Sequence, residues 1–242
     1  MLIHEKKPFF RGCLMLGSFL VLFVVLLSPV MHDEQGNKLT GLQYADNVFN
    51  ELSKGSSNFI PAVRQKVDTV KGKNVTVTVT MKKAELAPLA VKVLTKAGAE
   101  ASADGAKLTV KGDLAAILSA ATDDSEKLYH NDAASVQAKY EEKDARAVAG
   151  AWWYALSPSI KELQKQGMIP EAQVVDQVLR RAIEPGNNFF GIIPTKVSDH
   201  IVLLTVMLVF YILYTLWYGF SIFELFEGLG LAMTKSKVKQ ES

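Results

Sequence analysis

The chain has 242 residues, enough for one medium-sized domain or two small ones together with membrane segments. Apolar residues make up 49% of it, an ordinary value, but they are concentrated towards the two ends. The formal net charge of +2 is near neutral and forms no long basic run, so we expect no nucleic-acid partner. The single cysteine, Cys13, excludes an intramolecular disulfide, so the middle of the chain must be stabilised by burial.

The first apolar segment covers residues 12–30 and contains no charged side chain. At about 1.5 Å per residue, a helix of this length nearly matches the hydrocarbon thickness of a bilayer, about 30 Å. The N-terminal tail, residues 1–11, carries Lys6, Lys7 and Arg11. A cleavable signal peptide is the alternative, but the apolar run is long for one and no small-x-small cleavage site follows it. The sequence therefore predicts a first transmembrane helix.

Residues 31–199 are predicted to form an extracytoplasmic α+β domain that starts with a polar stretch and a turn at Gly36. A helix is predicted over residues 42–52, because apolar side chains recur there at three- and four-residue steps. These side chains are Leu42, Ala45, Val48, Phe49 and Leu52. A second short helix is predicted over residues 61–70.

The clearest strand of the sequence covers residues 74–80, where valine and threonine alternate. This alternation predicts one buried face and one polar face. A helix follows over residues 83–97. Proline is unfavourable inside a helix, so Pro88 moves the predicted start of this helix to about Ala87.

Residues 100–110 are predicted to form a hairpin with a two-residue turn at Asp104 and Gly105. A short helix over residues 113–121 comes next. The order strand, helix, strand, strand, helix predicts a small α+β part covering about residues 74–121.

The remainder of the domain, about residues 123–184, is predicted to be helical. We expect one long helix over residues 133–156, a stop at residues 157–159 where Pro158 lies, and a last helix beginning at Pro170. Residues 185–198 have little regular pattern and lead into the second apolar segment, so we expect them near the outer membrane surface.

The second apolar segment covers residues 201–223 and again contains no charge, which predicts a second transmembrane helix. The C-terminal tail, residues 224–242, carries Lys235, Lys237 and Lys239. Because basic residues flank the cytoplasmic ends of transmembrane helices, both termini are predicted to be cytoplasmic. The predicted location is the plasma (inner) membrane, with the middle domain periplasmic or extracellular.

Hydroxyl-bearing side chains recur along one side of the second segment. They are Tyr211, Tyr214, Thr215, Tyr218 and Ser221. Hydroxyl groups in hydrocarbon seek hydrogen-bond partners, so this side is predicted to be a helix-packing face. It would pack on the first segment, on a second copy of the chain or on another membrane subunit. Simple placement at the membrane–water interface would explain Tyr218 but not Tyr211.

The run Trp152, Trp153 and Tyr154 is the second candidate site. Adjacent aromatic side chains on a helix cannot all face one core. We therefore expect at least one of these rings to meet lipid headgroups, a partner or a ligand, with partial burial in the core as the alternative.

No sequence pattern predicts a catalytic, cofactor or metal site. The four histidines are scattered, and no phosphate-binding loop or nucleophile motif is present. The acidic residues of the helical part, including Asp123, Asp124 and Glu126, alternate with lysines as on a solvated helix.

The sequence thus predicts a membrane protein in which two transmembrane α-helices flank an extracytoplasmic α+β domain with a helical C-terminal half. The first functional hypothesis is a non-catalytic accessory, scaffolding or regulatory subunit of a membrane complex. The alternative is an extracytoplasmic ligand-binding or sensor module whose output is supplied by a partner. A membrane-anchored enzyme is the third hypothesis. The expected partners are the lipid bilayer and either other membrane subunits or a second copy.

Overall fold

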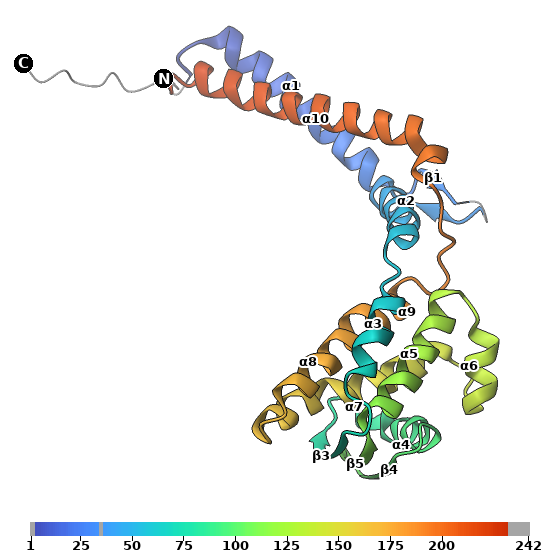
Figure 1. The fold of residues 1–242 in the computed structure, drawn as a ribbon. Helices are drawn as coiled ribbons and strands as arrows, with labels where there is room; N and C mark the ends of the chain where they lie inside the picture. The colour runs from blue at the N-terminus through green and yellow to red at the C-terminus, as the bar shows by residue number, and fades with distance from the viewer. Residues whose placement is uncertain (1–2, 34–35, 232–242) are drawn as a thin grey trace, which may run out of the picture. The chain divides into compact units, whose positions relative to one another are not determined.

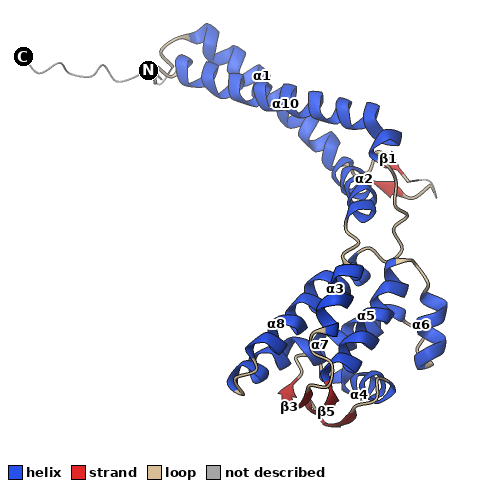
Figure 2. Cartoon of the chain, in the orientation of Figure 1, coloured by secondary structure: helices blue, strands red, loops and turns tan. Residues whose placement is uncertain are grey.

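The computed structural model describes residues 3–33 and 36–231, which are mostly helical with two small sheets (Figures 1 and 2). The chain divides into two units. The helix-pair unit comprises Met1–Leu52 with Thr195–Ser242, and the α+β unit comprises Ser53–Pro194. The lysines on which the predicted cytoplasmic position of the C-terminal tail depends, Lys235, Lys237 and Lys239, lie outside the described residues.

The helix-pair unit is built on α1 (Lys6–Leu27) and α10 (Ile201–Gly228), which lie side by side (Figure 1). Both helices are long and apolar enough to cross a membrane. The first helix starts and ends earlier than predicted. It ends because Ser28 precedes Pro29 and takes an extended conformation, as a proline favours for the residue before it.

Short elements connect the two long helices to the rest of the chain. Strands β1 (Met31–His32) and β2 (Lys38–Leu39) pair antiparallel, and helix α2 (Gly41–Ser56) follows. Helix α2 starts at a capping box, because Thr40 and Gln43 each accept a hydrogen bond from the other's backbone N–H. A short 3-10 turn, η3 (Val197–His200), leads into α10.

The sheet of the α+β unit contains β3 (Asn74–Thr80), β4 (Glu100–Asp104) and β5 (Lys107–Asp113). All pairs are antiparallel, in the order β3-β5-β4. The predicted strand at residues 74–80 is confirmed, and its valines are buried while its threonines are exposed. The hairpin turn lies one residue later than predicted, because Asp104 pairs with Lys107 and leaves Gly105 at the first central position. Gly105 has a φ of 56°, which glycine adopts without strain.

Helices cover this sheet and complete the core. Helices α4 (Ala87–Lys96) and α7 (Ala145–Lys165) pack on β4 and β3 and on each other. The start of α4 is at Ala87, as the position of Pro88 predicts, and a 3-10 turn, η1 (Ala84–Leu86), precedes it.

The other helices pack around α5 and α7 (Figure 1). They are α3 (Ile60–Asp68), α5 (Leu114–Tyr129), α6 (Ala133–Tyr140), α8 (Ile169–Val178), the π-helical segment η2 (Leu179–Ile183) and α9 (Glu184–Asn188).

Two predictions for the helical half are wrong. The long helix predicted over residues 133–156 is broken after Tyr140, where Glu141 has a φ of 50° and the Asp144 carboxylate caps the start of α7. The stop predicted at residues 157–159 does not occur, because α7 continues through Pro158 to Lys165. An interior proline costs about 3 kcal/mol, but α7 buries apolar side chains on both sides of Pro158, and this burial offsets the cost.

Candidate functional site

The contact between α1 and α10 follows a seven-residue repeat. The least exposed positions of α10 include Met207, Tyr214, Ser221 and Gly228. Those of α1 include Gly12, Phe19 and Leu26. Early residues of α1 meet late residues of α10, so the two helices run antiparallel. A seven-residue repeat is typical of helices that cross at a shallow angle and pack knobs into holes.

The predicted hydroxyl face coincides only in part with this contact. The Tyr214 ring stacks on Phe19 with centroids 4.3 Å apart, and the Tyr218 ring lies 5.1 Å from the same ring. Ser221 is fully buried. Tyr211 and Thr215 are exposed on the other side, and the Thr215 hydroxyl donates to the Tyr211 carbonyl at 2.7 Å. A threonine satisfies its hydroxyl inside its own helix in this way, so it needs no partner helix.

Glycines let the two helices approach closely. A Cβ atom on Gly12 would lie 2.7 Å from the backbone nitrogen of Leu225, and one on Gly228 would lie 2.5 Å from Phe9. The Gly228 carbonyl also accepts from the backbone N–H groups of His4 and Glu5. The sequence reasoning missed these glycines, although small residues at a helix interface are a signal of close packing in membranes.

An ion pair and an indole hydrogen bond add polar contacts to the apolar helix pair. Arg11 contacts Glu224 at 3.0 Å, near the start of α1 and the end of α10. The Trp217 indole N–H donates to the Met15 carbonyl at 3.1 Å. These contacts join the two helices at the same end as the close glycine contacts.

The three aromatic residues of the second predicted site have different environments. Trp152 is fully buried, and its indole N–H donates to the Asp124 carboxylate at 2.9 Å. Trp153 and Tyr154 are half-buried, and the Lys83 ammonium lies 5.3 Å from the centre of the Tyr154 ring. Trp152 is therefore part of the core, and Trp153 and Tyr154 are partly buried side chains that pack against it, each with one part open to solvent.

Asp124 organises a buried polar network on α5. Its carboxylate accepts from the Tyr140 hydroxyl at 2.6 Å and pairs with Lys139 at 2.7 Å, in addition to the bond from Trp152. The expectation of a solvated position is wrong for Asp124, which is 1% exposed. A buried carboxylate is stable when donors surround it, and here three donors from α6 and α7 do so.

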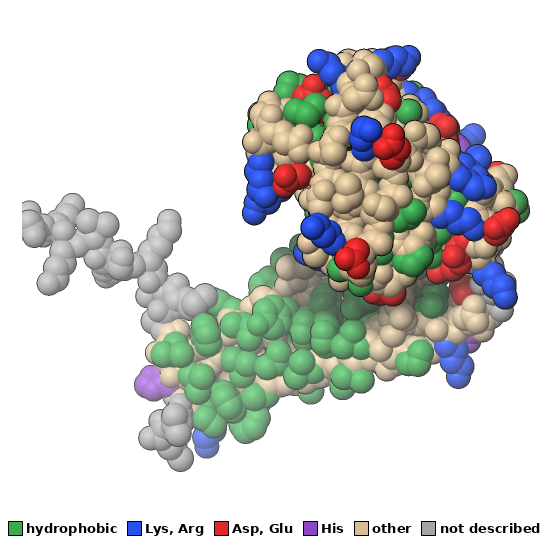
Figure 3. All heavy atoms as spheres, turned by 90° about the horizontal axis from the view of Figure 1, so that it is seen from below, with side chains coloured by type: hydrophobic (Ala, Val, Ile, Leu, Met, Phe, Trp, Pro, Cys, Tyr) green, Lys and Arg blue, Asp and Glu red, His purple; other side chains and the backbone are tan. Residues whose placement is uncertain are grey.

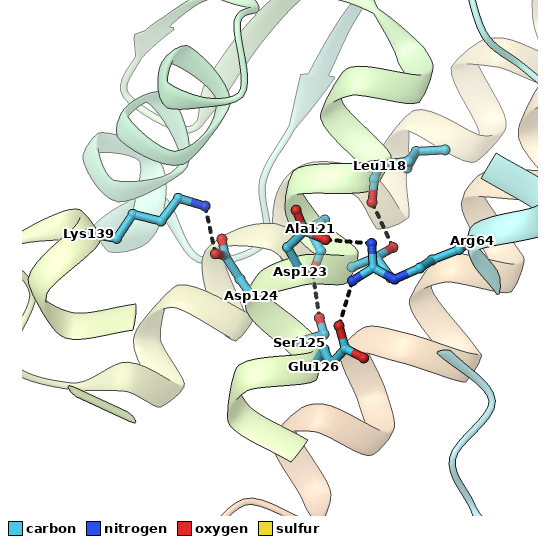
Figure 4. Close-up of polar contacts among 9 residues, drawn as sticks. Arg64, Leu118, Ala121, Asp123, Asp124, Ser125, Glu126 and Lys139 are labelled. Carbon is cyan, nitrogen blue, oxygen red and sulfur yellow. Dashed lines mark hydrogen bonds and ion pairs between the residues drawn. The ribbon is translucent and has the colours of Figure 1, made fainter. Parts of the chain in front are cut away.

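The neighbouring carboxylates of α5 point to the opposite side of the helix. Figure 4 shows Lys139 approaching Asp124 from one side and Arg64 approaching Asp123 and Glu126 from the other. Arg64, on α3, lies 2.6 Å from Asp123 and 2.5 Å from Glu126. These groups are partly exposed, so they form a surface ion-pair network that fastens α3 to α5.

The Tyr140 hydroxyl makes the stability of the α+β unit sensitive to alkali. Burial, together with the hydrogen bond to Asp124, raises the pKa of Tyr140 above its ordinary value of about 10. The unfolded chain releases this proton near pH 10 while the folded chain keeps it. The contribution is therefore fully present below about pH 10 and is lost as the pH rises further.

We expect the free energy of unfolding of the full chain to fall more steeply between about pH 9.5 and 11.5 than that of Tyr140→Phe. Chemical denaturation at several pH values measures this difference. Burial also raises the pKa of Tyr129, so the variant keeps part of the slope. Equal slopes for the two proteins would contradict the prediction.

Two adjoining surface pockets lie on either side of Trp153. The first, of about 610 Å³, lies between α7 and the α8–η2 segment. The second, of about 400 Å³, lies between α7, the end of η2, α9 and Lys83, which precedes η1. Trp153 and Glu184 line both pockets. The segment between them, η2, is π-helical, and such irregular turns are frequent at functional sites.

The charged side chains around these pockets have both signs. Lys161 and the ion pair of Asp176 with Arg180, at 2.8 Å, line the first pocket. Lys83 and Arg146 line the second. Trp153 therefore lies on an open surface that carries charges of both signs.

The interior of the α+β part is filled. The void between the sheet and α7 is about 20 Å³ and is lined by apolar side chains such as Val77, Leu94 and Leu156. This space is comparable to one water molecule and leaves no room for a ligand. Among residues 3–33 and 36–231, no group of three or more His, Cys, Asp or Glu side chains is arranged to hold a metal ion.

Comparison of the chain with protein-family models, with curated proteins and with solved structures finds no match. The kind of protein is therefore described by its fold and by its candidate site alone. The chain combines two helices that are long and apolar enough to cross a membrane with a helix-rich α+β unit that has an open aromatic surface.

Proposed function

We propose that this protein is a non-catalytic accessory subunit of a membrane complex, and that its α+β unit binds a protein partner at Trp153. The two long helices span the plasma membrane with both termini in the cytoplasm, and the α+β unit lies outside. The observation that carries the proposal is the position of Trp153, which forms the common wall of two adjoining surface pockets.

The surface around Trp153 fits a protein partner. Tryptophan and arginine are enriched among the residues that contribute most to protein–protein binding, and Arg146 and Arg180 flank Trp153. Both pockets are open depressions on the surface. A side chain of the partner would enter each of them and contact one face of the indole.

The helix pair supports the same proposal. Only a narrow stripe of each helix is used in the contact between α1 and α10, and Figure 3 shows apolar side chains covering the visible face of the pair. A groove of about 700 Å³ lies between the helices and is lined by Leu14, Met15 and Leu22 on one side and by Phe210, Leu213 and Trp217 on the other. Two helices offer no transport pathway of their own, so an accessory role fits them better than transport.

The test is site-specific cross-linking of the full chain in its native membrane. A photoreactive benzoylphenylalanine at position 153 should give a discrete cross-linked product with a partner. The same group in place of Lys107, the first residue of β5, is the control and should not give this product. The cross-linked partner is identified by mass spectrometry after mild detergent extraction.

The variant Trp153→Ala should lower the affinity for that partner by about thirtyfold or more, the effect of truncating a central aromatic residue at an interface. The thermal unfolding midpoint of the variant shows whether the α+β unit is still folded. A folded Trp153→Ala that binds the partner with unchanged affinity, or a position 153 that cross-links to nothing, would refute the proposed role of this surface.

An extracytoplasmic ligand-binding module is the second candidate function. The first pocket favours it, because Lys161, Arg180 and Gln164 present polar groups to one space of about 610 Å³. This function predicts that a small polar molecule raises the thermal unfolding midpoint of the native chain and not that of Arg180→Ala. The filled interior of the α+β part favours the accessory-subunit proposal instead.

A further inference from the structure

Helix α2 has an apolar edge that residues 3–33 and 36–231 leave uncovered. Leu42 is 59% exposed and Phe49 is 51% exposed. They are seven residues apart and therefore lie on the same edge of the helix. Val48, on the other side of the apolar stripe, is only 5% exposed. The protein thus covers one half of the stripe of α2 and leaves the other half open.

The position of α2 in the helix-pair unit places this edge at the ends of the two long helices. Its first residue, Gly41, lies against Leu26, because a Cβ atom there would be 3.2 Å from the Leu26 side chain and carbonyl. The Glu51 carbonyl accepts from the backbone N–H of Thr195, in the segment that leads into α10. Helix α2 therefore lies where α1 ends and where α10 begins.

The direction of α2 differs from that of the long helices. In Figure 1, α1 and α10 are seen along their length, whereas α2 is strongly foreshortened. Helix α2 thus turns across the axis of the helix pair. Exposed apolar side chains also flank the two long helices at this end, at Val30, Met31 and Val197.

We propose that α2 is an interfacial helix that lies in the outer surface of the bilayer, with Leu42 and Phe49 inserted among the lipid chains. An amphipathic helix at the end of a transmembrane segment buries its open apolar edge in this way. The inference rests on the proposed membrane crossing of α1 and α10, and it adds a lipid-binding surface that the crossing does not require.

Charge and size identify lipid as the occupant. The charged residues of α2 are Asp46, Glu51 and Lys54, and Lys54 is buried within the α+β unit. No cationic face is present on α2, so its binding depends on apolar burial and not on anionic lipid. A second copy of the chain is a poorer fit, because two side chains bury far less than the roughly 1,200 Å² of a stable protein interface.

The test uses the full chain with Cys13→Ser in nanodiscs of phosphatidylcholine. A nitroxide label is attached in turn to Leu42→Cys, Phe49→Cys and the polar-face control Asn47→Cys. All three positions are exposed, so the labels do not disturb the packing. Leu208→Cys, an exposed position within α10, reports the membrane crossing itself. Collision rates with oxygen, which dissolves in lipid, and with a water-soluble nickel chelate report the environment of each label.

We expect oxygen collisions to exceed nickel collisions at positions 42, 49 and 208, and the reverse at position 47. Labels at 42 and 49 that meet the nickel chelate as freely as position 47, while 208 remains in lipid, would refute the interfacial helix but leave the membrane crossing intact. Exposure of position 208 to nickel would refute the crossing and the inference together. If the labels at 42 and 49 are protected from both reagents, and if adding unlabelled chain removes spin–spin broadening between labels, a second copy of the chain covers this edge. That result would overturn the proposal.

Discussion

Replacing Gly12 with leucine will separate α1 from α10 at the end where their contact is closest. A Cβ atom at this position would lie 2.7 Å from the Leu225 backbone nitrogen and 3.0 Å from the Ser221 carbonyl. Backbone atoms cannot move aside as a flexible side chain can, so the helices must shift apart. Wider spacing removes the Phe19–Tyr214 stacking and the packing around it.

Gly17→Leu on the same helix is the matched control, because a Cβ atom on Gly17 meets nothing within 4 Å. Distances between nitroxides on Leu20→Cys and Leu213→Cys, two exposed positions, are measured in the full chain with Cys13→Ser by double electron–electron resonance. The distance distribution should lengthen and broaden for Gly12→Leu and remain that of the parent for Gly17→Leu. An unchanged distribution for Gly12→Leu would contradict the helix contact described above.

Asp124→Ala should lower the free energy of unfolding of the α+β unit by about 2–5 kcal/mol. The change leaves the buried N–H of Trp152 and the hydroxyl of Tyr140 without an acceptor, and it removes the counter-ion of Lys139. Lys139 is partly exposed and can turn towards water, so most of the loss comes from the two buried donors.

Asp123→Ala is the matched control for this prediction. Asp123 is the adjacent residue on the same helix, but its side chain is 48% exposed and its partner Arg64 is similarly exposed. A surface ion pair of this kind contributes less than about 1 kcal/mol. Guanidinium unfolding of the full chain in mild detergent, followed by tryptophan fluorescence, measures both variants. Similar losses for the two variants would show that burial at Asp124 does not determine its contribution.

Local patterns in the sequence were sufficient for several elements. The alternation of valine and threonine predicted β3 with its correct bounds, because a strand has a side-chain period of two. Pro88 predicted the start of α4, because proline is tolerated in the first turn of a helix. The two uncharged segments predicted α1 and α10, since a long apolar run has few alternatives.

Patterns that depend on the surroundings of a residue were misread. Pro158 predicted a helix stop, but the core packing of α7 outweighs the lost hydrogen bond. Asp124 resembled its solvated neighbours, because no sequence pattern distinguishes one carboxylate that faces Trp152 and Tyr140 from another that faces water. The hydroxyl face of α10 coincides with the helix contact only in part, because Thr215 satisfies its hydroxyl within its own helix and lies outside the contact.

The sequence by itself determined the two apolar helices, the order of strands and helices over about residues 74–121 and the alternation of β3, because each depends on spacing along a short stretch of chain. The tertiary structure alone decided which of three consecutive aromatic residues is core and which lies between two surface pockets. It also decided which glycines bring α1 and α10 together and which edge of α2 stays open. These properties depend on contacts between residues far apart in the chain, which local periodicity does not specify.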